Sequence, residues 1–141
     1  MIAILSLIIA VIFLALSIIH YYWAFGGKWA LNSALPTNKL GKKMLNPSVL
    51  MTVIVGVILS LFSIYYLQKG NIAQINLPKK ISSYLGYGIP VLFLIRAIGD
   101  FTYIGIFKKI KNTKFAKLDT KYYSPLCLVI SILGTIVEII K

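Results

Sequence analysis

The sequence predicts an all-α polytopic membrane protein, a bundle of four transmembrane helices that forms a single membrane domain over residues 1–141. Two observations support this fold class. Of the 141 residues, 59% are hydrophobic and only 13% are charged, whereas soluble domains average about 45–50% apolar and about 25% charged residues. In addition, four apolar stretches meet or approach the roughly 20 residues that a helix needs to cross about 30 Å of hydrocarbon.

The four predicted spans are residues 2–19, 48–67, 88–107 and 124–140. The first contains no charge, and because it lacks the basic leader and the small-residue cleavage site of a signal peptide, we expect a retained helix. The second follows Asn46-Pro47, which is typical of a helix start. The third contains Arg96 and Asp100, and the fourth is short and contains Glu138. The last two spans therefore hold the charges that need an explanation.

Small and polar residues recur at three- and four-residue steps along the spans, which places them on one face of each helix. In chain order these stripes are Ser6, Ala10, Phe13, Ser17 and His20; Thr52, Gly56, Ser60 and Ser63; Arg96, Asp100 and Tyr103; and Ser124, Cys127, Ser131, Thr135 and Glu138. Membrane helices pack through such faces, because apolar surface gains nothing by leaving lipid. We expect the stripes to face the interior, although a serine or threonine can instead bond its own helix backbone.

The formal net charge is +12, from 15 basic and 3 acidic residues. The basic residues lie between apolar runs rather than on one solvated face, so we expect no nucleic-acid partner. The first and third loops carry ten lysines, and the opposite side carries Lys69, Lys79, Lys80 and Lys141. Because lysine-rich loops stay in the cytoplasm, we expect those two loops inside and both termini outside. Their lysines should contact anionic headgroups of membrane lipids, at about 1 kcal/mol each.

Arg96 and Asp100 lie within the third predicted span. A charge near the middle of the bilayer costs at least about 2.5–3.5 kcal/mol, so both side chains need partners. They are four residues apart and can pair with each other, and Arg96 could also bridge Asp100 and Glu138, since a guanidinium offers five donors. The group is either an ion-pair clasp that fixes helix register or a site for a ligand, a lipid headgroup or a proton.

Aromatic residues at the end of the first span are typical of the membrane–water interface, where they anchor a helix or line a binding site. They are Tyr21, Tyr22, Trp23, Phe25 and Trp29. After Gly26-Gly27, a short amphipathic segment over residues 28–35 is expected to lie along the membrane surface. His20 precedes the aromatic residues and is a candidate proton donor or acceptor, because imidazole titrates near neutral pH.

Asp119 is the one acidic residue among the lysines of the third loop, where we expect it to cap the next helix or to reach toward His20. The candidate polar site therefore consists of Arg96, Asp100, His20, Trp23, Tyr103 and Asp119. The sequence contains no HExxH, CxxC, GxSxG or phosphate-binding glycine loop, so we expect no metal and no cofactor. Cys127 is the single cysteine and is expected to be an inert buried thiol.

Three blocks of residues occur in order along the chain. They are His20, Tyr22-Trp23-Ala24, Gly26-Gly27, Trp29 and Ala34-Leu35-Pro36; then Arg96-Ala97-Ile98-Gly99-Asp100 and Gly105; then Phe115, Asp119 and Tyr123-Ser124-Pro125-Leu126-Cys127. Over nearly the whole chain this set resembles domain of unknown function family 3995, which consists of small four-span bacterial membrane proteins. The resemblance implies a multi-pass protein of the bacterial cell membrane in which the three blocks form one assembly. It implies no activity, and Glu138 belongs to none of the blocks.

Three kinds of function fit these residues. We rank first a polar intramembrane pocket that binds or transports a small ligand, a proton or a lipid headgroup, because a bundle offers an interior site and the sequence lacks a nucleophile or metal set. A membrane-embedded enzyme that uses Asp100 or His20 as acid or base on a lipid-soluble substrate is the alternative. A noncatalytic partner or immunity-type protein is the third. The ligand and the oligomeric state do not follow from the sequence.

Overall fold

The computed structural model describes residues 1–140, which are helical apart from their connecting loops. The helices are α1 (Ile2–Ala24), α2 (Leu31–Ala34), α3 (Val49–Lys69), α4 (Lys79–Ile98), α5 (Lys114–Leu118) and α6 (Ser124–Ile140), and a π-helical turn, Asp119–Tyr123, joins the last two. Four stretches are long and apolar enough to cross a bilayer: α1, α3, α4 and the continuous helical segment Lys114–Ile140. The predicted fold class is thereby confirmed. Lys141 lies outside the described residues.

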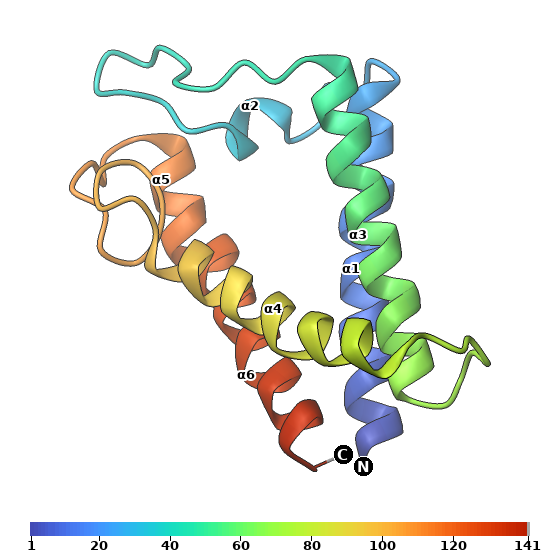
Figure 1. Cartoon of the computed structure of the whole chain (residues 1–141). Coiled ribbons are helices and arrows are strands. Elements are labelled where there is room, and N and C mark those ends of the chain that lie inside the picture. The colour runs from blue at the N-terminus through green and yellow to red at the C-terminus, as the bar shows by residue number, and fades with distance from the viewer. Residues whose placement is uncertain (141) are drawn as a thin grey trace.

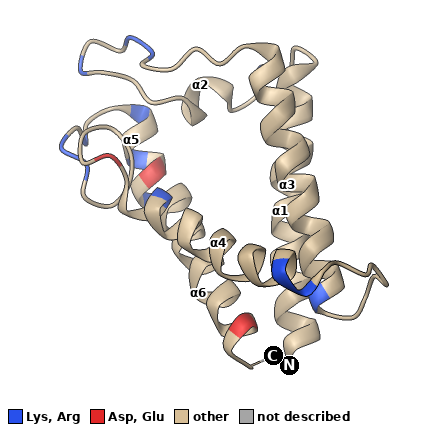
Figure 2. Cartoon of the chain, viewed as in Figure 1, with Lys and Arg blue, Asp and Glu red and all other residues tan. Residues whose placement is uncertain are grey.

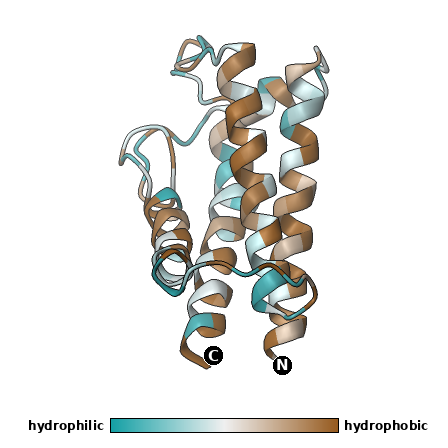
Figure 3. Cartoon of the chain, turned by 45° about the vertical axis from the view of Figure 1, so that its right-hand side comes forward, coloured by the Kyte–Doolittle hydropathy of each residue, from teal (hydrophilic) through white to brown (hydrophobic). Residues whose placement is uncertain are grey.

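The long helices form two hairpins, α1 with α3 and α4 with α6 (Figure 1). The hairpins meet at the end of the molecule that holds the two termini and diverge toward the other end, where α2 and α5 lie (Figure 1). Hydrophobic residues predominate along all four long helices (Figure 3). Many of these hydrophobic side chains are exposed on the outside of the molecule, where they can contact the acyl chains of the lipids.

The first hairpin is held by the small polar stripes of α1 and α3. The Ser17 hydroxyl donates to the Gly56 carbonyl at 2.8 Å and lies 2.6 Å from the Ser60 hydroxyl. The Ser63 hydroxyl donates to the Ala10 carbonyl, also at 2.8 Å. Such bonds between helices contribute modestly in membranes, on the order of 0.6 kcal/mol each. They confirm that these two stripes face each other.

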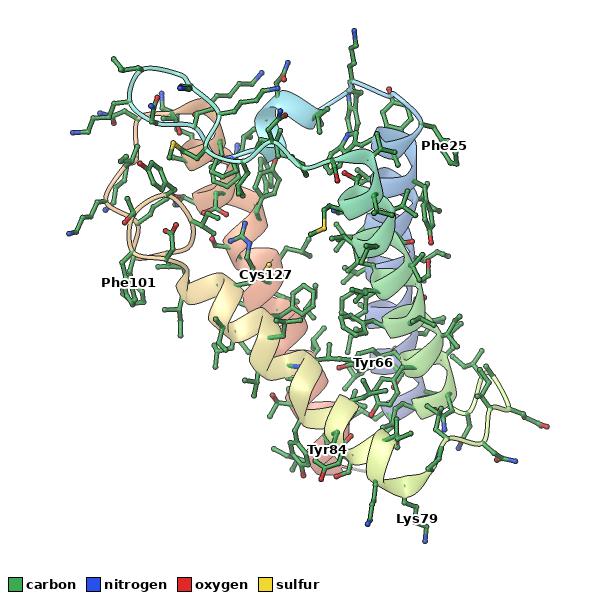
Figure 4. The ribbon with its side chains drawn as sticks, turned by 45° about the horizontal axis from the view of Figure 1, so that its top comes forward. Phe25, Tyr66, Lys79, Tyr84, Phe101 and Cys127 are labelled. Carbon is green, nitrogen blue, oxygen red and sulfur yellow. The ribbon has the colours of Figure 1, made fainter. Side chains whose placement is uncertain are left out.

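An aromatic cluster fills the region where the two hairpins meet. Phe13 of α1 is fully buried, stacks on Tyr66 of α3 at 5.8 Å between ring centroids, and meets Phe93 of α4 edge to face at 5.2 Å. Gly134 of α6 lies against Tyr66 and Pro90, so a side chain there would push the hairpins apart. Tyr66 therefore lies at the junction, as its position between the hairpins shows (Figure 4).

The third helix begins and ends about nine residues earlier than predicted. It covers Lys79–Ile98 rather than residues 88–107. It ends at Gly99, whose φ of +86° is a conformation that favours glycine over any other residue. The helix still has 20 residues, because it begins earlier and includes Lys79 and Lys80 in its first turn. The long side chains of these lysines can reach water while their apolar stems stay in the hydrocarbon layer. Asp100 and Tyr103 consequently lie beyond the helix, and the predicted stripe that they form with Arg96 is wrong.

The stripe on the fourth helix is largely confirmed. Ser124, Cys127, Ser131 and Glu138 are buried. Thr135 instead faces outward, and its hydroxyl donates to the Ser131 carbonyl one turn earlier on the same helix. This self-bonding satisfies a hydroxyl in an apolar medium without any partner from another helix.

Candidate functional site

Asp119 is the centre of a charge cluster between the end of α4 and the start of α6. It is fully buried at the first position of the π-helical turn. Its Oδ1 accepts a hydrogen bond from Arg96 Nη2 at 3.0 Å, and its Oδ2 accepts from the Gly105 backbone N–H at 2.8 Å and from Lys108 Nζ at 3.1 Å. Both carboxylate oxygens are therefore occupied, one by each of two cations.

Lys108 is the second cation of the cluster and is 1% exposed. Its ammonium group donates to Asp119, to the Gly105 carbonyl at 2.9 Å and to the Thr120 hydroxyl at 2.7 Å. These bonds use all three ammonium protons, as burial of a lysine demands. The Thr120 hydroxyl in turn donates to the Ala116 carbonyl. Lys108 thus ties the loop after α4 to the helical turn that carries Asp119.

Arg96, in the last turn of α4, is only partly satisfied. Its side chain is 33% exposed, whereas the Asp119 side chain is fully enclosed. Nη2 bonds Asp119, but Nη1 is buried and has no hydrogen-bond partner within residues 1–140. Two cations share one carboxylate, so the three groups together carry one net positive charge. An anion beside the exposed part of the Arg96 side chain would meet this excess positive charge.

The predicted pairing of Arg96 with Asp100 and Glu138 is wrong. Arg96 bonds Asp119 instead, while Glu138 pairs with Lys69 of α3 at 2.6 Å at the opposite end of the molecule. The reason is the earlier end of α4. Asp100 no longer follows Arg96 by one helical turn, and the chain reverses after Gly99. The interpretation of the three charges as one clasp is therefore replaced by two separate ion-pair groups.

Asp100 organises the loop that follows α4. Its Oδ1 accepts hydrogen bonds from the backbone N–H groups of Thr102, Tyr103 and Ile104 at 2.9, 2.7 and 3.0 Å. Burial disfavours the ionised carboxylate, but the backbone donors of Ile104, Thr102 and Tyr103 outweigh it and hold the pKa of Asp100 below its usual range. Asp100 is thus a turn-forming residue, and Tyr103 takes part through its backbone.

Two glycines allow this loop to fold back on the end of α4. Gly99 and Gly105 both have positive φ, and a Cβ on either would collide with the backbone of the other segment. The Ile106 N–H donates to the Ala97 carbonyl at 2.8 Å, which closes the loop. The close approach positions the Gly105 N–H toward Asp119, so the glycine pair is a structural condition of the charge cluster.

His20 and Trp23 lie in a different place, in a mostly apolar groove of about 400 Å³ between α1, α3 and the segment around α2. His20 Nδ1 lies 2.7 Å from the Leu16 carbonyl, and Trp23 Nε1 donates to the Trp29 carbonyl at 2.8 Å. No hydrogen bond or ion pair within the described chain joins His20 to Asp100 or Asp119. Asp119 therefore does not contact His20, as one of the two expectations had it. His20, Asp100 and Asp119 form no acid–base set.

Sequence reasoning missed three residues that matter here: Lys108, Gly105 and Lys69. Lys108 is one of six similar lysines in its loop, and nothing in the sequence distinguishes the buried one from its exposed neighbours. Gly105 carried a signal, because it stands in one of the residue blocks that support the family resemblance. Lys69 lies 69 residues from its partner Glu138, and no local pattern predicts a pairing over that distance.

Comparisons with known proteins support the family resemblance. The family model described as "Protein of unknown function (DUF3995)" matches residues 13–134. The matched range includes α3, α4, α5 and the whole charge cluster. No curated protein and no solved structure matches the chain.

Proposed function

The chain belongs to the DUF3995 family of proteins of unknown function, and from its charge cluster we propose that this integral membrane protein binds an anionic lipid headgroup at Arg96. The observation that carries the proposal is the incomplete neutralisation of the guanidinium. Asp119 accepts from Nη2 alone, and Nη1 lacks a partner within residues 1–140. A guanidinium offers paired donors that fit a phosphate, which makes Arg96 the natural contact for a phospholipid.

The depth of Arg96 supports a headgroup rather than an acyl chain. Arg96 lies in the last turn of α4, and the lysine-rich third loop follows that helix. Such loops lie in the headgroup region outside the hydrocarbon layer, so we place Arg96 near the boundary between the two regions. Its partly exposed side chain can contact the phosphate groups of the lipids there. The headgroup reading is therefore favoured over proton transport, which would need a chain of titratable groups.

We further propose that the end of the molecule with the charge cluster faces the cytoplasm of a bacterial cell. The first and third loops, with their ten lysines, lie at this end together with α2 and α5 (Figure 2). Lysine-rich loops are retained on the cytoplasmic side, and the anionic lipids of that leaflet are the ligands that Arg96 would meet.

Cysteine labelling tests this orientation. In intact cells, Lys42→Cys should resist a membrane-impermeant maleimide and Lys80→Cys should react, because both positions are exposed but lie at opposite ends. After cell lysis both should react. Labelling of position 42 in intact cells would reverse the orientation and would place Arg96 in the outer leaflet.

Substitution of Arg96 tests the headgroup site itself. The protein is reconstituted in vesicles of phosphatidylcholine and phosphatidylglycerol, and the lipid that stays bound is measured by native mass spectrometry. Arg96→Gln should lower the amount of bound phosphatidylglycerol by about tenfold or more relative to the unaltered protein. A charge-assisted hydrogen bond contributes about 1.5–3 kcal/mol, which corresponds to roughly 10–150-fold in affinity. The fold should persist, because Lys108 still neutralises Asp119 and the Gly105 N–H still donates a hydrogen bond to it.

Lys79→Gln is the matched control for this measurement. It also removes one positive charge, but from an exposed position at the opposite end of α4. It should leave retention of phosphatidylglycerol at the Arg96 site within about twofold, since Lys79 lies at the other end of α4 and does not contact that site. Equal retention by Arg96→Gln and the unaltered protein would refute the headgroup site.

A further inference from the structure

A basic groove of about 610 Å³ lies between the first and third loops. Its lining comes from segments about 70 residues apart in the chain, Thr37, Asn38, Lys39 and Gly41 on one side and Lys109, Ile110, Lys111, Asn112, Thr113 and Lys114 on the other. Arg96 is not among these residues, and neither is any acidic residue. The groove is thus a separate feature from the headgroup contact at Arg96.

Hydrogen bonds from backbone N–H groups give both walls of the groove a defined shape. In the first loop, Asn38 Oδ1 accepts from the N–H groups of Leu40 and Lys42 at 3.0 and 2.9 Å, which closes a tight turn. In the third loop, the Lys109 and Ile110 N–H groups donate to the carbonyls of Phe101 and Thr102. These hydrogen bonds fix the backbone from which the lysines of both loops extend.

Four lysines of the groove have no acidic ion-pair partner among residues 1–140. They are Lys39, Lys109, Lys111 and Lys114, and no ion pair within residues 1–140 includes any of them. The chain has only three acidic side chains. Asp119 is held by Arg96 and Lys108, Glu138 by Lys69, and Asp100 by three backbone N–H groups. Within residues 1–140, no acidic side chain is left to balance the positive charge of this groove.

We propose that this groove binds a phosphate ligand with at least two negative charges, either a terminal phosphate on a lipid headgroup or a soluble polyphosphate. Four lysines that line one groove concentrate like charge there, and a multivalent anion can interact favourably with several of them at once. The volume lies within the range of about 300–1,000 Å³ found for small-molecule sites. Bound phosphate would join the first loop to the third and stabilise the end of the molecule where the hairpins diverge.

Binding measurements in nanodiscs of two compositions test the proposal and separate the two sources. The first arm adds sodium triphosphate to protein in phosphatidylcholine nanodiscs, with sodium chloride at equal ionic strength as reference, and measures thermal unfolding. The second arm uses phosphatidylcholine nanodiscs that contain phosphatidic acid, without triphosphate. Lys109→Gln with Lys111→Gln is the test variant, and Lys79→Gln with Lys80→Gln is the matched control that removes two lysines from the opposite end.

The expected result is stabilisation of the unaltered protein and of the control in at least one arm, with affinity lowered about 30-fold in the test variant. Two lysines at about 1 kcal/mol each give this factor. Stabilisation by triphosphate identifies a soluble ligand, and stabilisation by phosphatidic acid alone identifies a lipid. No stabilisation in either arm, or equal loss in both double variants, overturns the proposal. Arg96→Gln should keep groove binding, so failure of one site leaves the other testable.

Discussion

Asp119→Asn is expected to lower the free energy of unfolding by about 3–5 kcal/mol, because removal of one partner leaves buried charge uncompensated. Lys108 is 1% exposed, and Asp119 is the one ion-pair partner that either Lys108 or Arg96 has within residues 1–140, so both cations would lose their counter-charge. Asparagine keeps the shape of the side chain, so the loss reports charge rather than packing. The effect can be measured by unfolding in mixed detergent micelles of increasing SDS fraction, followed by tryptophan fluorescence.

Asp100→Asn serves as the control for this experiment. Asp100 is exposed, and the asparagine carbonyl oxygen can accept the same three backbone N–H bonds, so its effect should stay within about 1 kcal/mol. A double variant, Lys108→Met with Asp119→Leu, should recover part of the lost stability, since apolar groups often replace a buried ion pair. If Asp119→Asn were as stable as Asp100→Asn, the cluster would not hold the loop to α6.

Gly105→Ala is expected to destabilise the protein by a similar amount. Gly105 has a φ of +93°, and an added Cβ would overlap the Ile98 carbonyl and the Cα of Gly99. Backbone strain of about 1–3 kcal/mol and overpacking of about 1–3 kcal/mol combine to roughly 2–6 kcal/mol. The Gly105 N–H would also move away from Asp119, so the variant should lose protection of the loop over residues 99–113 against proteolysis.

Gly88→Ala is the matched control for the glycine substitution. Gly88 lies within α4, and apart from its chain neighbours and the nearby backbone of its own helix no atom of residues 1–140 lies within 4 Å of the position that its Cβ would occupy. Alanine there should leave stability unchanged or raise it by about 0.5–1 kcal/mol, because alanine forms helix more readily than glycine. A Gly105→Ala variant that unfolds like Gly88→Ala would show that the loop can move away from the end of α4 without loss.

The composition of the chain and the order of its apolar stretches were sufficient to predict a four-span membrane protein. Spans of apolar residues are a local property, since each helix satisfies its own backbone hydrogen bonds inside the bilayer. The stripes on α1 and α3 were predicted for the same reason, because helical spacing places Ser17 and Ser63 on a defined face before any partner is known. The third span was misplaced because Lys79 and Lys80 resemble loop residues, although long side chains at a helix end reach water.

Charge partners were decided by the tertiary structure. Arg96 and Asp100 are close in sequence, yet the chain reversal at Gly99 separates them and brings Asp119, 23 residues from Arg96, against the guanidinium. The sequence does not distinguish Lys108 from the neighbouring lysines, and only the packing of the loop places it against Asp119. The +12 net charge is a property of the sequence, whereas the choice of the two cations that share a buried carboxylate depends on which segments pack together. The physical reason is desolvation. A charged group that packing removes from water must be paired with an opposite charge, so the segments that pack together determine which cations pair with Asp119.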